Sequence, residues 1–146
     1  MINNVQKLRD ATGAGVMDCK KALVDADGNF DKAAVLIRER GLIKAEKKSE
    51  RKTGTGLIES YVHNERVGVL MEIRCETDFV ARSEVFRELA RNLTMQIAAM
   101  NPENIEELLK QAYVKDESLT VEEIIKQAIA KLGENIRIEK ICRYEI

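Results

Sequence analysis

The sequence predicts an α+β fold in which three short helices precede a small antiparallel β-sheet of about three strands covered by helices. Apolar residues recur at helical spacing between glycine-containing turns over residues 1–43. Two runs of alternating apolar and polar residues flank a short turn within residues 54–75, which is typical of a β-hairpin. The alternation returns over residues 136–146 after further helical segments. This order of elements favours a sheet covered by helices on one face.

The first 43 residues predict a three-helix module. The first helix ends at residues 12–15, where two glycines allow the positive φ values of a tight turn. Residues 27–29 form the second turn, and Asp27 or Asn29 is placed to cap the third helix. Gly41 stands where a glycine commonly follows the last turn of a helix, so we expect the third helix to end there.

Residues 44–53, KAEKKSERKT, are almost wholly charged and mark a boundary in the chain. The segment is predicted either as an extended helix end or as a mobile linker. An RNA-binding segment is a third interpretation, but Glu39, Glu46 and Glu50 dilute its positive charge. We therefore expect a charged linker between a module of residues 1–43 and a second domain of residues 54–146.

The second domain begins with the hairpin, whose strands are residues 54–63 and 67–75. A long helix follows, because apolar residues recur at helical spacing over residues 86–100. Asn101 and Pro102 then stop this helix, since the residue before a proline disfavours the helical conformation.

The rest of the second domain is predicted as two helices and a returning strand. Residues 105–109 suggest a shorter helix, and residues 115–118 are expected to form a loop. Thr120 and Glu123 form a capping box, T-x-x-E, which opens a helix that ends at Gly133. The third strand follows that glycine and completes the sheet.

Composition excludes several classes of function. Charged residues make up 34% of the chain but the net charge is −1, unlike the basic surface of most nucleic-acid-binding proteins. Trp is absent and aromatic residues make up 4%, so no stacking platform for single-stranded RNA is expected. No apolar run approaches the roughly 18 residues of a membrane span, and no targeting leader is recognised. We expect no nucleic acid and no membrane as direct partners, and a cytoplasmic location.

No catalytic or metal-binding constellation stands out in the sequence. The single histidine, His63, lies at the hairpin turn, and the glycine-rich motifs that cradle phosphates are absent. Cys19, Cys75 and Cys142 are far apart with no C-x-x-C pair, which argues against zinc and fits a reducing compartment. The sequence therefore predicts a protein that is not an enzyme and that uses no metal or other cofactor.

Two segments carry a resemblance to a known family. Residues 12–23, TGAGVMDCKKAL, resemble the N-terminal signature of elongation factor Ts, which lies in a three-helix module of the ubiquitin-associated type. Residues 75–82, CETDFVAR, follow GVLME at residues 68–72 and are similar to the second signature of that family. GENI at residues 133–136 also resembles the family's helix-to-strand join. These matches occur in family order along the whole chain.

The resemblance implies a partner, a mechanism and a site. The family binds the GDP form of elongation factor Tu and speeds GDP release, so that GTP can bind. Four residues match the segment that the family places near the partner's Mg²⁺ site: Thr77, Asp78, Phe79 and Val80. Six residues match the part of the N-terminal module that touches the partner's nucleotide-binding domain: Thr12, Gly13, Ala14, Gly15, Val16 and Met17.

Without the resemblance, the same residues have plainer interpretations. Phe79 would be a core residue at the start of a helix, and Asp78 an acidic residue favoured there by the helix dipole. Residues 12–15 would be only a turn, and Val16 and Met17 would belong partly to the core. The competing function is a ubiquitin-associated-type adaptor that binds another protein without exchange activity.

The length of the chain departs from the pattern of long family members. Those members carry two related core halves in one chain, whereas this sequence has room for one. Short members make up the difference by forming a homodimer, so the resemblance implies a homodimer here. The last strand supplies the expected contact through Ile138, Cys142 and Tyr144. A disulfide through Cys142 is conceivable by symmetry, although a reducing cytosol argues against needing one.

Overall fold

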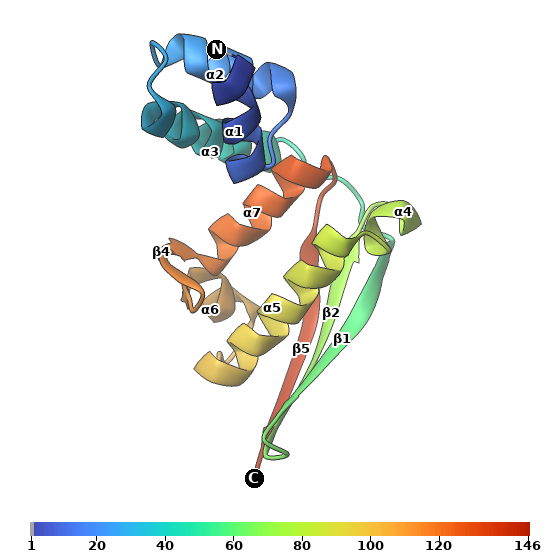
Figure 1. The fold of residues 1–146 in the computed structure, drawn as a ribbon. Helices are drawn as coiled ribbons and strands as arrows, with labels where there is room; N and C mark the ends of the chain where they lie inside the picture. The colour runs from blue at the N-terminus through green and yellow to red at the C-terminus, as the bar shows by residue number, and fades with distance from the viewer. Residues whose placement is uncertain (1) are drawn as a thin grey trace.

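The computed structural model describes residues 2–146, with three N-terminal helices followed by a layered α/β core (Figure 1). The helices of the core lie along one face of a three-stranded sheet, and the N-terminal helices lie at one end of this assembly. The predicted α+β class is therefore confirmed. Within residues 2–146, none of the helices has the length and apolar character that a bilayer span requires.

The N-terminal module consists of α1 (Ile2–Thr12), α2 (Val16–Asp25) and α3 (Phe30–Glu46). These helices share a small core of their own, formed by the buried residues Leu8, Cys19, Ala22, Leu23, Ala26 and Ala33. Asn29 caps α3, because its Oδ1 accepts a hydrogen bond of 3.0 Å from the N–H of Lys32. The sequence-based assignment of three helices to this region is confirmed.

The third helix does not end at Gly41, so that prediction is wrong. α3 continues to Glu46 and a turn then covers residues 47–50, so the first part of the charged segment is an extended helix end. Gly41 is used for packing instead. A Cβ atom at this position would lie 3.4 Å from the Cβ of Ala130 in α7 (Val121–Leu132). A Cβ atom at this distance would be in ordinary van der Waals contact, so Gly41 lies where α3 packs against α7 and the module joins the core.

The main sheet has the strand order β1-β2-β5, with both pairs antiparallel. Its strands are β1 (Thr55–His63), β2 (Val67–Cys75) and β5 (Arg137–Glu145). The hairpin and the returning strand are where the alternation of the sequence predicts them. β2 is the central strand, so its inward residues Met71, Ile73 and Cys75 are almost completely buried.

Four helices accompany the sheet: α4 (Asp78–Ala81), α5 (Glu84–Met100), α6 (Ile105–Lys110) and α7. α5 ends at Asn101 in the left-handed conformation, with φ of 45°, and α7 ends at Gly133, with φ of 77°. Thr120 caps α7 by accepting a hydrogen bond of 3.2 Å from the N–H of Glu123. The predicted ends of these two helices are therefore confirmed.

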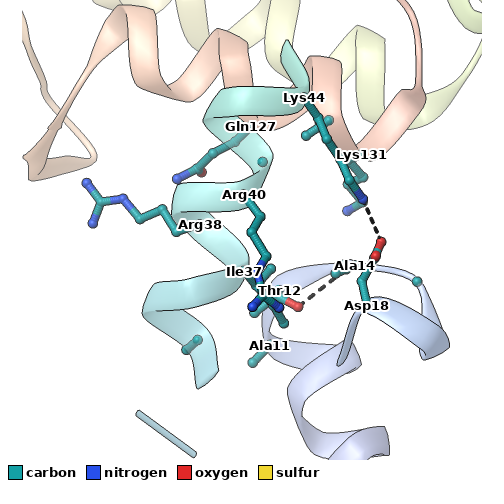
Figure 2. Close-up of a pocket in the computed structure, with 15 residues that line it drawn as sticks. Ala11, Thr12, Ala14, Asp18, Ile37, Arg38, Arg40, Lys44, Gln127 and Lys131 are labelled. Carbon is teal, nitrogen blue, oxygen red and sulfur yellow. Dashed lines mark hydrogen bonds and ion pairs between the residues drawn. The ribbon is translucent and has the colours of Figure 1, made fainter. Parts of the chain in front are cut away.

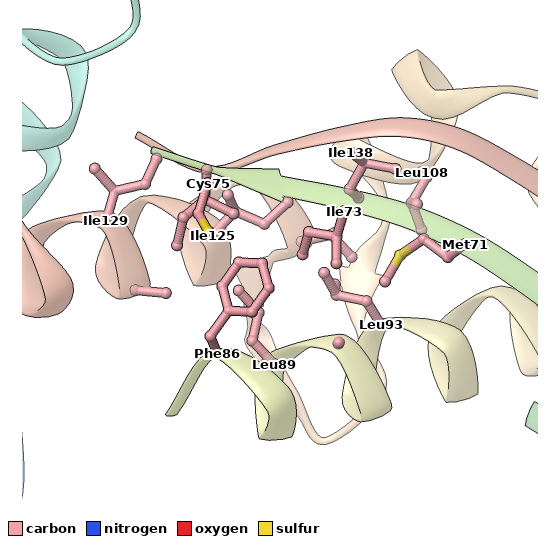
Figure 3. Close-up of a cluster of buried hydrophobic side chains, with 14 of the residues drawn as sticks. Met71, Ile73, Cys75, Phe86, Leu89, Leu93, Leu108, Ile125, Ile129 and Ile138 are labelled. Atoms are coloured by element: carbon pink, nitrogen blue, oxygen red, sulfur yellow. The ribbon is translucent and has the colours of Figure 1, made fainter. Parts of the chain in front are cut away.

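The core lies between these helices and the sheet. Figure 3 shows Phe86, Leu89 and Leu93 of α5 pointing toward the buried side of β2, which carries Met71, Ile73 and Cys75. α7 contributes to the same layer and completes one continuous apolar core. This leaves the opposite face of the sheet uncovered within residues 2–146.

The segment predicted as a loop at residues 115–118 is partly a strand. β3 (Ala112–Tyr113) and β4 (Asp116–Thr120) form a small antiparallel pair. The buried side chain of Gln96 supports it, because Nε2 donates to the carbonyl of Ala112 at 3.1 Å and Oε1 accepts from the N–H of Val114 at 2.8 Å. The strand arises from this contact with α5, and the alternation of the local sequence is too weak to show it.

Candidate functional site

The most exposed large hydrophobic side chain of residues 54–146 projects from the corner between β2 and α5. Thr77 starts this corner as the N-cap of α4, where its Oγ1 accepts a hydrogen bond of 3.4 Å from the N–H of Val80. Phe79 occupies the second position of α4 and is 86% exposed. A phenylalanine that open to water has no role in the core, so the interpretation of Phe79 as a core residue is wrong.

The corner holds this aromatic ring because its neighbours are anchored. Val80 and Ala81 are 4% and 6% exposed and pack into the core. Burying an aliphatic side chain of this size stabilises by about 1.5–3 kcal/mol, which fixes the short helix to the sheet. Val80 therefore lies beneath the corner, and the exposed surface of the corner consists of Thr77, Asp78 and Phe79.

Asp78 adds a negative charge beside the aromatic ring. Its Oδ2 lies 2.8 Å from Nη2 of Arg82, and both side chains are mostly exposed. An exposed ion pair of this kind contributes at most about 1 kcal/mol, because water competes for both charges. The carboxylate can therefore exchange Arg82 for a group on a partner at little cost.

The second predicted region, residues 12–17, forms the turn between α1 and α2 and the first residues of α2. The hydroxyl of Thr12 donates to the carbonyl of Leu8 at 2.7 Å and accepts from the N–H of Ala14 at 3.3 Å. Gly13 has φ of +70°, a conformation that favours glycine. Val16 and Met17 are 48% and 73% exposed, so the expectation that they belong partly to the core is wrong.

A cavity of about 300 Å³ lies where the N-terminal module meets α7 (Figure 2). The turn of residues 12–15 forms one wall, and α3 and α7 form the others. Lys44 reaches across it to Asp18, with Nζ 2.9 Å from Oδ2. Its lining includes no residue of the corner at 77–80. The two predicted partner-binding regions are therefore separate surfaces of one molecule.

The residues predicted for the dimer contact divide between the two faces of β5. Ile138 is 7% exposed and belongs to the core, which removes it from the candidate contact. Cys142 and Tyr144 lie on the uncovered face and are exposed. The antiparallel register with β2 places Cys142 opposite Leu70 and Tyr144 opposite Gly68. Leu70 is 52% exposed on the same face.

Sequence reasoning missed the full extent of this outer sheet face. β1 adds Ile58 and Val62, which are 71% and 65% exposed. The signal was present in the sequence, because the residues two apart along a strand share a face. We define the outer sheet face by its exposed apolar residues Ile58, Val62, Leu70, Cys142 and Tyr144.

The described residues offer no alternative centre for metal chemistry. Among residues 2–146, no cluster of three or more His, Cys, Asp or Glu side chains is arranged to hold a metal ion. Burial raises the pKa of the Cys75 thiol, and the nearby negative charge of Glu134 raises it further. Both effects disfavour the thiolate, so Cys75 is poorly suited to act as a nucleophile.

Comparison with known proteins decides the family. The family model described as elongation factor TS matches residues 76–146. An elongation factor Ts of Rippkaea orientalis (strain PCC 8801 / RF-1) is 43% identical to this chain, with 96% of this chain and 75% of the relative covered. The chain belongs to the elongation factor Ts family. An elongation factor Ts of Prochlorococcus marinus (strain MIT 9215) is 42% identical, with 97% of this chain and 87% of the relative covered.

Members of the elongation factor Ts family are nucleotide exchange factors for elongation factor Tu and are not enzymes. Both alignments are longer than this chain of 146 residues, at 187 and 189 positions, so these relatives contain residues without a counterpart here. The matched family model begins at Glu76 and therefore includes the corner and the last strand. The turn at residues 12–17 lies outside that model.

Proposed function

We propose that this chain releases GDP from elongation factor Tu by placing Phe79 against the structure that surrounds the partner's Mg²⁺ ion. The observation that carries the proposal is the exposed ring of Phe79, 86% open to solvent, on a corner anchored by Val80 and Ala81. An anchored aromatic ring can displace groups on a partner without itself giving way.

The physical route is loss of the metal from the nucleotide site. Mg²⁺ requires near-ideal octahedral geometry and is usually held by one or two protein ligands together with phosphate oxygens. Small shifts in those ligands or in the groups that orient them are costly to metal binding. Once the ion is lost, the charge of the phosphates is less neutralised and GDP leaves faster.

The magnitude available from one ring limits its share of the effect. Complete burial of a Phe side chain contributes about 1.5–3 kcal/mol. Since about 1.4 kcal/mol corresponds to a tenfold change, Phe79 alone accounts for roughly one to two decades of acceleration. Any larger acceleration requires further contacts from the N-terminal module and the sheet.

We propose that residues 12–17 supply one of these further contacts, on the partner's nucleotide-binding domain. The support is the exposure of Val16 and Met17 beside the glycine turn. The proposed division of labour assigns binding to residues 1–43 and exchange to residues 54–146, with residues 44–53 between them. Two separate clusters of buried residues, one in the module and one in the core, support this division.

Linkage adds a condition to the mechanism. If this chain weakens GDP binding, GDP weakens the binding of this chain by the same factor. Nucleotide therefore displaces the factor at the end of each cycle. This reciprocity makes the chain a catalyst of exchange that is not consumed.

We also propose that two copies associate through the outer sheet face. The support is a row of exposed apolar side chains on all three strands, which is unusual for a surface that stays in water. A two-fold arrangement would present two equivalent exchange corners. In this proposal Cys142 and Tyr144 contact the second copy together with Leu70.

The test of the proposed function is release of a fluorescent GDP analogue from elongation factor Tu, chased with excess unlabelled GDP. Wild type and Phe79→Ala are compared in Mg²⁺ and in chelator. We expect catalytic amounts of wild type to accelerate release, and Phe79→Ala to lose about one to two decades of that acceleration in Mg²⁺ only. A wild type that binds elongation factor Tu without accelerating release would instead be an adaptor, and the roles of Asp78 and Phe79 would be wrong.

A further inference from the structure

The corner that carries Phe79 is held from outside by one carboxylate. Glu134, in the join between α7 and β5, accepts hydrogen bonds from the N–H groups of Glu76 and Thr77 at 3.2 and 2.9 Å. Its other oxygen accepts a hydrogen bond of 2.6 Å from the hydroxyl of Thr77. Hydrogen bonds to an ionised acceptor are shorter and stronger than those between neutral groups. Three such bonds converge on the carboxylate of Glu134.

These bonds set the orientation of the α4 cap. The hydroxyl of Thr77 has one proton, and it is directed to Glu134. A lone pair of the same oxygen is then free to accept the N–H of Val80, which closes the first turn of α4. Phe79 lies inside that turn. The direction in which the ring projects therefore depends on a residue 57 positions away from Thr77 along the chain.

The contact is reciprocal, which makes the join rigid. Oε1 of Glu76 accepts a hydrogen bond of 2.8 Å from the N–H of Asn135, the residue after Glu134. The amide of Asn135 is buried and donates to the carbonyls of Ser49 and Arg51 at 3.3 and 2.9 Å. The corner at residues 77–80 and the segment after α3 are therefore both held by the adjacent residues Glu134 and Asn135.

We infer that Glu134 is a positioning residue for nucleotide exchange, which acts through Thr77 to hold Phe79 in its projecting orientation. The inference rests on the proposed function of Phe79. In this role Glu134 does not contact the nucleotide or Mg²⁺. Its role is to keep the ring from relaxing into other orientations when it meets the partner.

The experiment uses the full chain and elongation factor Tu loaded with the fluorescent GDP analogue, at saturating factor. Glu134→Ala is expected to lower the maximal release rate about tenfold in Mg²⁺, because a small misplacement of an acting group is costly. The difference is expected to vanish in chelator. Glu134→Gln keeps a carbonyl acceptor for the two N–H groups and is expected to retain most of the rate. Glu139→Ala removes an exposed carboxylate of β5 that pairs with Arg137, and serves as the matched control.

A double variant separates positioning from general destabilisation. If Glu134 acts through Phe79, then Glu134→Ala combined with Phe79→Ala is no slower than Phe79→Ala alone. Additive losses would overturn the inference, as would equal losses in Mg²⁺ and in chelator. A Glu134→Ala rate equal to wild type, with Phe79→Ala slow, would remove the inference and leave the proposed function intact. If wild type itself does not accelerate release, the proposed function fails, and the role of Glu134 fails with it.

Hydrogen exchange tests the contact in the wild-type protein, so the test does not require that a variant folds. In wild type, the amide protons of Glu76 and Thr77 are expected to be protected by their bonds to Glu134. Rapid exchange of both would show that the corner is not held by this carboxylate, and would overturn the inference. Slow exchange in wild type and in Glu134→Gln, which keeps a carbonyl acceptor, with fast exchange in Glu134→Ala would support it.

Discussion

Phe79 and Val80 are neighbours in the chain, yet Phe79 is 86% exposed and Val80 is 4% exposed. One turn of helix thus sends an aromatic ring into solvent and an aliphatic side chain into the core. The two residues are therefore expected to respond in opposite ways to truncation.

Phe79→Ala is expected to change the free energy of unfolding by less than about 0.5 kcal/mol, since the ring contributes little to the core. Val80→Ala is expected to cost about 1–3 kcal/mol, because it leaves a cavity beneath the corner. Chemical denaturation of both variants checks this pair. An equal loss of stability in the two variants would contradict the described corner.

The outer sheet face gives the second prediction. Leu70→Lys places a charge in the middle of this apolar face and is expected to weaken self-association about tenfold or more. Val35→Lys is the control, because Val35 is 55% exposed on α3, away from the sheet. Sedimentation equilibrium measures the dissociation constant. The proposed dimer contact is wrong if the two substitutions have the same effect, or if wild type is a monomer at every concentration.

The three cysteines are expected to differ in reactivity. Cys142 is exposed, whereas Cys19 and Cys75 are buried. The pKa of Cys75 is also raised by burial and by the charge of Glu134, which lowers its thiolate population. Brief treatment with iodoacetamide at neutral pH should therefore modify Cys142 first, as read by mass spectrometry. If the outer sheet face forms a dimer, this modification should slow as the protein concentration rises.

An ion pair between the module and the core makes stability depend on pH. Nη2 of Arg38 in α3 lies 2.7 Å from Oε2 of Glu123 in α7. This hydrogen bond from Arg38 lowers the pKa of the Glu123 carboxyl below its ordinary value. Because the folded pKa is the lower one, the stabilisation is fully present above the ordinary carboxyl pKa and is lost as pH falls through the lowered value.

Glu123→Gln is therefore expected to be less stable than wild type near neutral pH, by less than about 1 kcal/mol for so exposed a pair. The difference should shrink and then disappear as pH falls through the lowered pKa of Glu123, because the carboxyl is then protonated in wild type. Thermal unfolding across this range measures it. Arg38→Gln should show the same pH dependence, and a difference that stays constant into acid would contradict the role of this pair.

Local patterns in the sequence were sufficient for most of the fold. The capping box at Thr120 and the glycine at 133 act through bonds within a few residues, so they can be read from the sequence. The strands of the main sheet are long enough for their alternation to be clear. The errors lie where a distant element decides the outcome. Gly41 continues a helix because α7 packs against it, and β3 exists because Gln96 binds it.

In the candidate site, too, the features set by local sequence were predicted, and those set by distant elements were not. The position of residues 77–80 at the end of a strand followed from the pattern, but their exposure did not. Hydrophobicity alone favours a buried Phe79, and it is exposed because Val80 and Ala81 fill the space under the corner. Ile138 was placed on the wrong face because a β-bulge between Ile138 and Lys140 shifts the register of β5, which turns Ile138 toward the core while Cys142 and Tyr144 stay on the outer face. The contact between Glu134 and Thr77 joins segments 57 positions apart, which no local pattern reveals.

The strand order β1-β2-β5 has a consequence for how the chain matures on the ribosome. The buried residues of the N-terminal module all precede β1, so this part can fold while synthesis continues. β5 is the last strand of the chain, and Glu134 lies in the join just before it. Both are therefore synthesised after every other described helix and strand. Until then β2 has one unpaired edge, and the hydroxyl of Thr77 at the cap of α4 lacks its bond to Glu134. In the proposed mechanism, a nascent chain therefore presents the module of residues 1–43 before Glu134 has positioned the corner at residues 77–80, and it becomes competent for nucleotide exchange only after β5 has joined the sheet.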